Sequence, residues 1–438
     1  MWPVVPTKRL WLLAAFGLLL TLGGAALPGL EKLALPYDFG LLVLFWSTGS
    51  LARKWDVLQV RRTFDPVMSV RQQNTVTLIL ESLAPVDLLL KIRDEPPPTF
   101  AVQGNEFELR LAPRQEASHD YWVVPSERGN HEFSDLYVSY GAPLGLARVQ
   151  KAIPTPQQAH VYPNVKAVRE FDFLKQKGRL REAGVRQTRS KGLGTEFESL
   201  REYNDDDFRL IDWKSTARRG RLVVKNFEQE RNQAVMVCLD LGRHMLGEVG
   251  GVSKIDHALD AAIMVFHAAE RAGDMVGLYA FNDAVRAYVA PRRGKTQVST
   301  VLKAAHALFA EPVQPDYTKA LTYLSTKWKK RSLIVFFTDA ENEDQANNLA
   351  AALAHVRRHH LLMIVRVKDP KLNELLNLPF DTPDDLFSRS AATWYQSDRM
   401  KAASVFAASG IHSIESEPDE LAATLVNAYL RAKRLALL

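Results

Sequence analysis

The stretch AVMVCLDLGRHM, Ala234 to Met245, decides the fold class of the second half of the chain. Its first part is an unbroken apolar run, which is typical of a buried strand in a parallel sheet, and Asp240 follows that run directly. A second apolar run, SLIVFFTDA, leads into Asp339 in the same way. Because parallel strands end at one edge of a sheet, the two carboxylates are predicted to be neighbours.

Strand-like and helix-like patterns alternate from residue 233 to the end of the chain. Short apolar runs at 275–281 and 361–367 predict further strands, and they are separated by segments with apolar residues at helical spacing. This rhythm predicts a Rossmann-like α/β domain over 233–438, with a mostly parallel sheet covered on both faces.

Residues 55–153 show a different pattern. Short alternating runs such as TVTLILES and EFELRLAP recur about every ten residues and are separated by Pro, Gly and Asn. They predict an antiparallel β-sandwich. The following residues, 154–232, are predicted to be a polar connector with a sequence motif inside it.

Residues 1–54 are predicted to form a two-helix transmembrane anchor. The run 10–27 is uncharged and has roughly the length that a helix needs to cross a bilayer, and 33–51 is a weaker second run. Basic residues flank the pair on both outer sides, at Lys8, Arg9, Arg53 and Lys54. That distribution predicts a multi-pass bacterial inner-membrane protein with its large domains in the cytosol. A cleaved signal peptide is the alternative interpretation of the first run.

Composition excludes several kinds of site. The 438 residues contain one cysteine, Cys238, so an internal disulfide and a cysteine-based zinc site are excluded. The segment 177–191 is strongly basic, and it is interpreted as a solvated loop, with binding of anionic lipid or nucleic acid as the alternatives. His355 and His359 lie four residues apart on a predicted helix, and a solvated helix end is preferred over a metal pair there.

The two aspartates and the residues between them resemble the metal ion adhesion site of von Willebrand factor A domains. That family uses an Asp-x-Ser-x-Ser loop, a later Thr and a later Asp. The matching positions here are Asp240, Gly242, His244, Thr318 and Asp339. The absence of both serines predicts a degenerate site at which Mg²⁺ binds weakly or not at all, because magnesium requires a full shell of oxygen ligands. In a metal-free version, Arg243 and His244 receive an acidic group of the partner directly.

Two adjacent carboxylates also occur in the active sites of metal-dependent hydrolases, and in this alternative Asp240 and Asp339 are the catalytic groups. The sequence has no phosphate-binding glycine loop, no HExxH and no GxSxG motif beside them. We therefore expect a protein that is not an enzyme.

The stretch GLGTEFESLREYNDDDFRLIDWKSTARRGRLVVKNFEQER, Gly192 to Arg231, is named here the signature segment. It resembles the hallmark of the domain of unknown function 58 family, in which a G-x-G-x-E-F, L-R-x-Y, D-x-x-R-x-I-D-W and A-R pattern precedes a von Willebrand A-like domain. The resemblance implies a partner of the MoxR type of AAA+ ATPase.

Two roles are open for this segment. Arg201 and Arg218 can form ion pairs with acidic residues such as Asp212 that pin the segment to the sheet, with Trp213 and Phe197 as large anchors. Alternatively, the same side chains form a protein-docking surface, since Trp and Arg dominate binding energy at interfaces. The expected function is a non-catalytic adaptor or scaffold that binds the ATPase or its client proteins.

Overall fold

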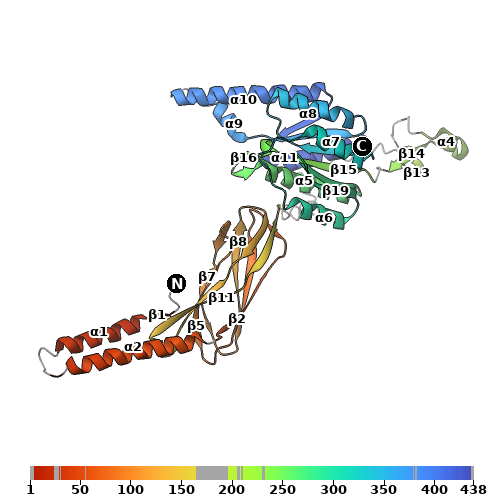
Figure 1. Ribbon diagram of the computed structural model, residues 1–438. Coiled ribbons are helices and arrows are strands. Elements are labelled where there is room, and N and C mark those ends of the chain that lie inside the picture. The colour runs from red at the N-terminus through yellow and green to blue at the C-terminus, as the bar shows by residue number, and fades with distance from the viewer. Residues whose placement is uncertain are drawn as a thin grey trace. The chain divides into compact units, whose positions relative to one another are not determined.

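The computed structural model divides into two compact units, Met1–Tyr162 and Pro163–Leu438, and each is described by itself (Figure 1). The residues that the structure describes are 4–23, 29, 31–54, 56–163, 196–204, 208, 211–228, 232–377, 379 and 382–435. The basic segment 177–191 lies outside these residues.

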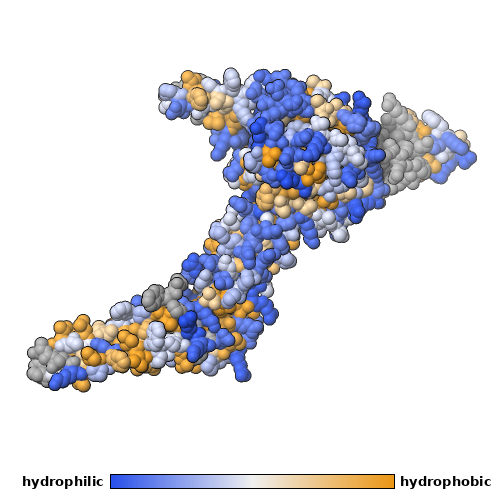
Figure 2. Space-filling model, in the orientation of Figure 1, coloured by the Kyte–Doolittle hydropathy of each residue, from blue (hydrophilic) through white to orange (hydrophobic). Residues whose placement is uncertain are grey.

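The first unit begins with a strand and a helical hairpin. Strand β1 (Val4–Pro6) precedes helices α1 (Lys8–Gly23) and α2 (Glu31–Arg53). The hydroxyl of Tyr37 on α2 donates a hydrogen bond of 3.1 Å to the carbonyl of Leu13 on α1. Figure 2 shows many hydrophobic residues along this hairpin, and large apolar side chains such as Trp11 and Trp46 are exposed there.

The prediction of a transmembrane anchor is wrong for this hairpin. In the part of the chain that the structure describes, no helix combines the length and the apolar character needed to span a bilayer. Helix α1 has 16 residues, fewer than the roughly 20 required. Helix α2 has 23 residues but begins with Glu31 and Lys32 and also contains Asp38. The same finding contradicts the prediction of a multi-pass inner-membrane protein with its large domains in the cytosol.

Three sheets make up the rest of the first unit. Their strand orders are β1-β11-β10-β5-β7, β2-β4-β8-β6 and β3-β12-β9. The bounds are β2 (Leu58–Phe64), β3 (Met68–Ser69), β4 (Asn74–Ser82), β5 (Leu88–Asp94), β6 (Phe100–Gln103), β7 (Glu106–Leu111), β8 (Glu116–Pro125), β9 (Gly129–Phe133), β10 (Leu136–Gly141), β11 (Ala147–Ile153) and β12 (Gln157–Tyr162). Alternate residues of β4 and β5 are buried, and both larger sheets contribute to one core.

A buried ion pair crosses that core. Arg62 of β2 donates to both carboxylate oxygens of Asp94 at the end of β5, and the Nε contact is 2.9 Å. The hydroxyl of Tyr121 on β8 donates to the same carboxylate. Because these strands belong to both larger sheets, the polar group joins the sheets inside the apolar core.

The second unit contains a mixed six-stranded sheet of order β19-β18-β15-β20-β21-β22. Strands β18, β15, β20, β21 and β22 run parallel, whereas β19 is antiparallel to β18. The strands are β15 (Ala234–Asp240), β18 (Met275–Phe281), β19 (Val285–Arg292), β20 (Ser332–Phe337), β21 (Leu361–Val367) and β22 (His412–Ser416), with a small pair β16 (Glu248–Val249) and β17 (Val252–Ser253).

Helices cover both faces of this sheet. Helices α5, α6 and α11 pack on one face and α7, α8 and α10 on the other. Their bounds are α5 (Lys254–Arg271), α6 (Lys295–Ala305), α7 (Tyr317–Lys327), α8 (Glu343–Val356), α10 (Pro383–Ala408) and α11 (Pro418–Arg434), and a short α9 (Pro370–Leu376) precedes α10. Cys238 on β15 is fully buried among the second group, as its apolar surroundings predicted.

Candidate functional site

The two aspartates lie at the same edge of the sheet. Asp240 is the last residue of β15, and Asp339 follows the end of β20 by two residues. The two strands are parallel neighbours, with Leu239 paired to Phe337. The predicted proximity at the carboxyl edge is therefore confirmed.

Asp240 is completely buried and surrounded by hydrogen-bond donors. Its Oδ1 accepts from the backbone N–H of Gly242 at 2.8 Å. Its Oδ2 accepts from the hydroxyls of Thr338 at 2.7 Å and Tyr317 at 2.9 Å. Burial raises the pKa of Asp240, and these three hydrogen bonds offset part of that rise.

Asp339 is bound by two cations instead. The Lys254 ammonium, at the start of α5, contacts Oδ2, and the guanidinium of Arg399 on α10 donates to Oδ1 at 2.8 Å. Burial lowers the pKa of Lys254, but its interaction with Asp339 outweighs this and raises the pKa above its usual range. Lys254 therefore remains an ammonium although it is largely buried.

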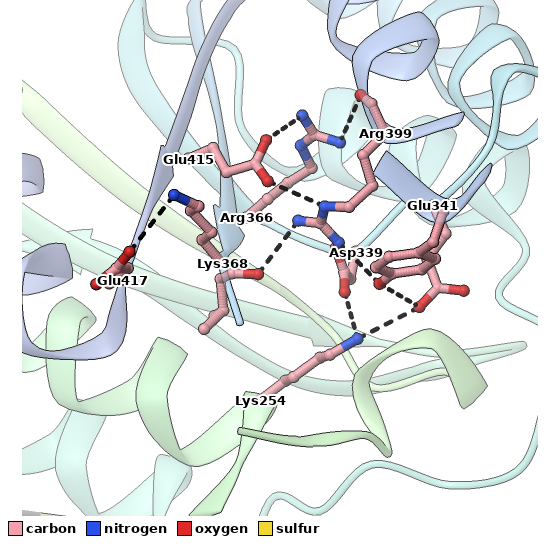
Figure 3. Close-up of polar contacts among 10 residues, drawn as sticks. Lys254, Asp339, Glu341, Arg366, Lys368, Arg399, Glu415 and Glu417 are labelled. Carbon is pink, nitrogen blue, oxygen red and sulfur yellow. Dashed lines mark hydrogen bonds and ion pairs between the residues drawn. The ribbon is translucent and has the colours of Figure 1, made fainter. Parts of the chain in front are cut away.

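These contacts continue into a larger ionic group, named here the edge cluster and drawn in Figure 3. Arg399 also donates to Glu415 on β22 at 2.9 Å, and Arg366 on β21 donates to the other oxygen of Glu415 at 2.7 Å. Lys254 reaches Glu341 at 3.3 Å. The members of the edge cluster are Lys254, Asp339, Glu341, Arg366, Arg399 and Glu415. Three positive and three negative side chains thus balance in a mostly buried site.

The residues at this edge do not fit a magnesium ion. Both oxygens of each aspartate already accept from protein donors, and the ammonium of Lys254 lies against Asp339. Thr318 is exposed on α7, and the neighbouring Tyr317 reaches Asp240 in its place. Among the described residues, no three His, Cys, Asp or Glu side chains are grouped so that they could hold a metal.

The loop after β15 shows why its first serine is missing. A Cβ atom on Gly242 would lie 2.7 Å from Cδ of Pro315 and 3.0 Å from Oδ1 of Asp240. A serine at that position would therefore displace the proline or the carboxylate. Arg243 is exposed, whereas His244 is buried and its Nε2 has no hydrogen-bond partner in the described structure.

The signature segment forms a separate substructure. Strands β13 (Glu196–Glu202) and β14 (Val223–Glu228) pair as an antiparallel hairpin, and helix α4 (Trp213–Arg219) lies between them in the chain. Asp212 caps α4 by accepting from the backbone N–H of Ser215 at 2.8 Å. Arg201 belongs to β13, but its side chain lies outside the described part.

Two aromatic residues of this segment, Phe208 and Trp213, face solvent. Trp213 is 67% exposed and Phe208 is 68% exposed, and Phe208 stacks on Tyr203 with ring centroids 5.6 Å apart. Arg218 is exposed on α4 as well. Trp213 is therefore not packed as an anchor in the part of the segment that the structure describes.

Several residues at the carboxyl edge of the sheet were not predicted from the sequence. Thr338 directly precedes Asp339, so the FFTDA pattern already contained its signal. No sequence pattern near Asp339 indicates Lys254 or Arg399, because these residues belong to helices α5 and α10, which are distant from Asp339 in the chain.

The C-terminal unit is thus an α/β domain whose carboxyl edge is neutralised by its own cations. Residues 199–398 match the family described as protein of unknown function DUF58. No curated protein matches the chain.

Solved structures show slight likenesses. The conserved hypothetical protein BatB from Bacteroides thetaiotaomicron is 9% identical, with 46% of this chain and 98% of that chain covered and a TM-score of 0.30. The CARDB domain of the PF1109 protein from Pyrococcus furiosus is 12% identical, with 24% of this chain and 90% of that chain covered and a TM-score of 0.17. At these TM-scores neither likeness indicates a function.

Proposed function

We propose that this chain is a non-catalytic adaptor that binds a partner protein through its signature segment. The exposure of Trp213, together with Phe208 and Arg218 nearby in the chain, carries the proposal. An exposed tryptophan next to arginine is the composition of an interface hot spot, because large flat side chains exclude water on binding. The von Willebrand A-like α/β unit then serves as the rigid support of this surface.

The resemblance to the DUF58 family suggests a MoxR-type AAA+ ATPase as the partner. The surface is also suited to client proteins of such an ATPase. The alternative function, a metal-dependent hydrolase at Asp240 and Asp339, lacks support, because both carboxylates are buried and already hydrogen-bonded. Binding of lipid or nucleic acid depends on residues 177–191, which lie outside the described structure.

A crosslinking pull-down with the full-length chain tests the adaptor. We expect an AAA+ ATPase among the captured proteins, and Trp213→Ala should weaken the purified complex roughly 30-fold, or about 2 kcal/mol. The matched control is Trp394→Ala on α10, a tryptophan that is 79% exposed. It should bind as the unmodified chain does.

Neither substitution removes much packing, so both variants should melt with the unmodified chain, within about 0.5 kcal/mol. Equal binding by the Trp213→Ala variant, or loss only in the Trp394→Ala variant, would remove the signature segment as the docking surface.

A further inference from the structure

We propose that the Lys254 ammonium is a built-in replacement for a divalent cation at the carboxyl edge of the sheet, so that this edge works without metal. The inference concerns the edge cluster alone and does not depend on the identity of the partner protein. With the ammonium in place of a metal, Asp240 and Asp339 can lie at the same edge of the sheet without the serines that a metal would need.

The position of Lys254 in its helix is the first argument. Lys254 is the first residue of α5, where Ser253 caps the helix by accepting from the backbone N–H of Asp256. The amino end of a helix carries positive partial charge, so a lysine is locally unfavourable there. Its side chain is only 11% exposed. Local helix preference therefore does not account for this lysine, whereas its ion pair with Asp339 does.

The surroundings of the side chain are the second argument. A Cβ atom on Gly247 would lie 3.0 Å from Cε and 3.2 Å from Nζ of Lys254. Glycine at this position leaves space for the end of the lysine. The loop and the lysine thus form a fitted slot that brings the ammonium to the carboxylate.

The distribution of charge is the third argument. Lys254 contacts one oxygen of Asp339 and Arg399 the other, so two cations already flank this carboxylate. A divalent ion placed beside them would meet strong repulsion at short range in a site with little water. Metal binding would require the ammonium to leave.

Glu341 lies on the solvent-exposed side of Lys254. Its side chain is 38% exposed, and its Oε1 makes two long contacts, 3.3 Å to Lys254 and 3.3 Å to the hydroxyl of Tyr395. Asp339, by contrast, is 1% exposed. Lys254 therefore bridges a fixed inner carboxylate and a loosely held outer one, as a bound metal would bridge two carboxylates.

Thermal melting of the full chain in EDTA, MgCl2 and MnCl2 tests the replacement. The unmodified chain should melt at the same temperature in all three. Lys254→Ser removes the ammonium from Oδ2 of Asp339 and from Glu341, while Arg399 still holds Oδ1 of Asp339. A divalent ion can then take the place of the ammonium, so the melting temperature of this variant should be lower in EDTA and rise by several degrees in MnCl2. Lys368→Ser is the matched control. The ammonium of Lys368 lies 3.4 Å from the carboxylate of Glu417, in an ion pair that does not include Asp339. This control variant should show no response to manganese.

Two results would overturn the proposal. One is a folded Lys254→Ser variant whose melting ignores manganese. The other is saturable Mn²⁺ binding by the unmodified chain, measured by calorimetry, that Asp339→Asn abolishes. The calorimetric measurement decides the question even if Lys254→Ser does not fold.

Discussion

At the scale of single residues, Asp240 shows how a buried carboxylate is stabilised without a counter-ion in contact. Three donors, from Gly242, Tyr317 and Thr338, surround it. Its raised pKa means that the folded chain binds a proton there more readily than the unfolded chain. The associated loss of stability therefore develops as the pH rises from the ordinary aspartate range through the folded pKa.

Tyr317→Phe should make this pH dependence steeper. The substitution removes one donor to the ionised form, so the free energy of unfolding should fall by about 1–3 kcal/mol where Asp240 is ionised and by less where it is protonated. Urea unfolding near the ordinary pKa of an aspartate and at alkaline pH measures the difference. Tyr323→Phe, on the same helix, keeps the ring stacking with Tyr279 and is the control. Equal losses at both pH values would contradict the prediction.

Sequence reasoning placed Asp240 and Asp339 correctly, because each follows an unbroken apolar run and parallel strands end together. It placed the wrong hydroxyl beside Asp240. Residues 317 and 318 adjoin each other at the start of a helix, and only the packing of α7 decides which of them points toward the sheet. Lys254 and Arg399 were missed, since a tertiary ion pair leaves no periodic pattern.

At the scale of elements, helix α11 is held on the sheet by a buried polar group in addition to its apolar packing. Lys433 donates to both oxygens of Asp274 at 2.7 and 2.6 Å, and the hydroxyl of Tyr429 donates to the same carboxylate at 2.6 Å. Asp274 directly precedes β18, so this group joins the last described helix to the strand next to the edge strand β19.

Lys433→Met should loosen α11. It leaves the buried carboxylate of Asp274 without its cation, and breaking such a pair typically costs about 3–5 kcal/mol. Hydrogen exchange of the α11 amides should accelerate accordingly, whereas Arg431→Ala, at an exposed position of the same helix, should leave exchange unchanged. Unaltered protection in the Lys433→Met variant would show that apolar packing alone fixes this helix.

The first helices show the limit of reasoning from apolar runs. An uncharged stretch predicts that helix is possible but not where it ends, and the described α1 ends at Gly23. The β-rich pattern of 55–153 was more informative, because alternation of period two specifies strands and their buried face. The first unit nevertheless extends beyond that range, since β1 pairs with β11 and β12 pairs with β9.

At the scale of the whole molecule, the two units have separate cores, so damage to one should leave the other intact. Arg62→Met removes the cation paired with Asp94 in the first unit. The free energy of unfolding of that unit should fall by about 3–5 kcal/mol. Hydrogen exchange on the full chain should show faster exchange in β4, β5 and β8 and unchanged exchange in β15 and β20.

Arg61→Met is the matched control, because Arg61 adjoins Arg62 on β2 and is exposed. It should change neither unit. Faster exchange in β15 and β20 of the Arg62→Met variant would mean that the chain unfolds as one cooperative body.

Strand β19, which runs antiparallel in the six-stranded sheet, also affects self-association. β19 forms one margin of the sheet, and it contains Pro291, two register irregularities opposite β18, and the charged Arg286 and Arg292. Gly277 on β18 leaves space for the proline ring, since a Cβ there would lie 2.7 Å from Cγ of Pro291. A proline lacks the N–H that a foreign strand would bind, and irregular, charged margins resist such pairing. We therefore expect this edge of the sheet to resist pairing with a strand of another molecule.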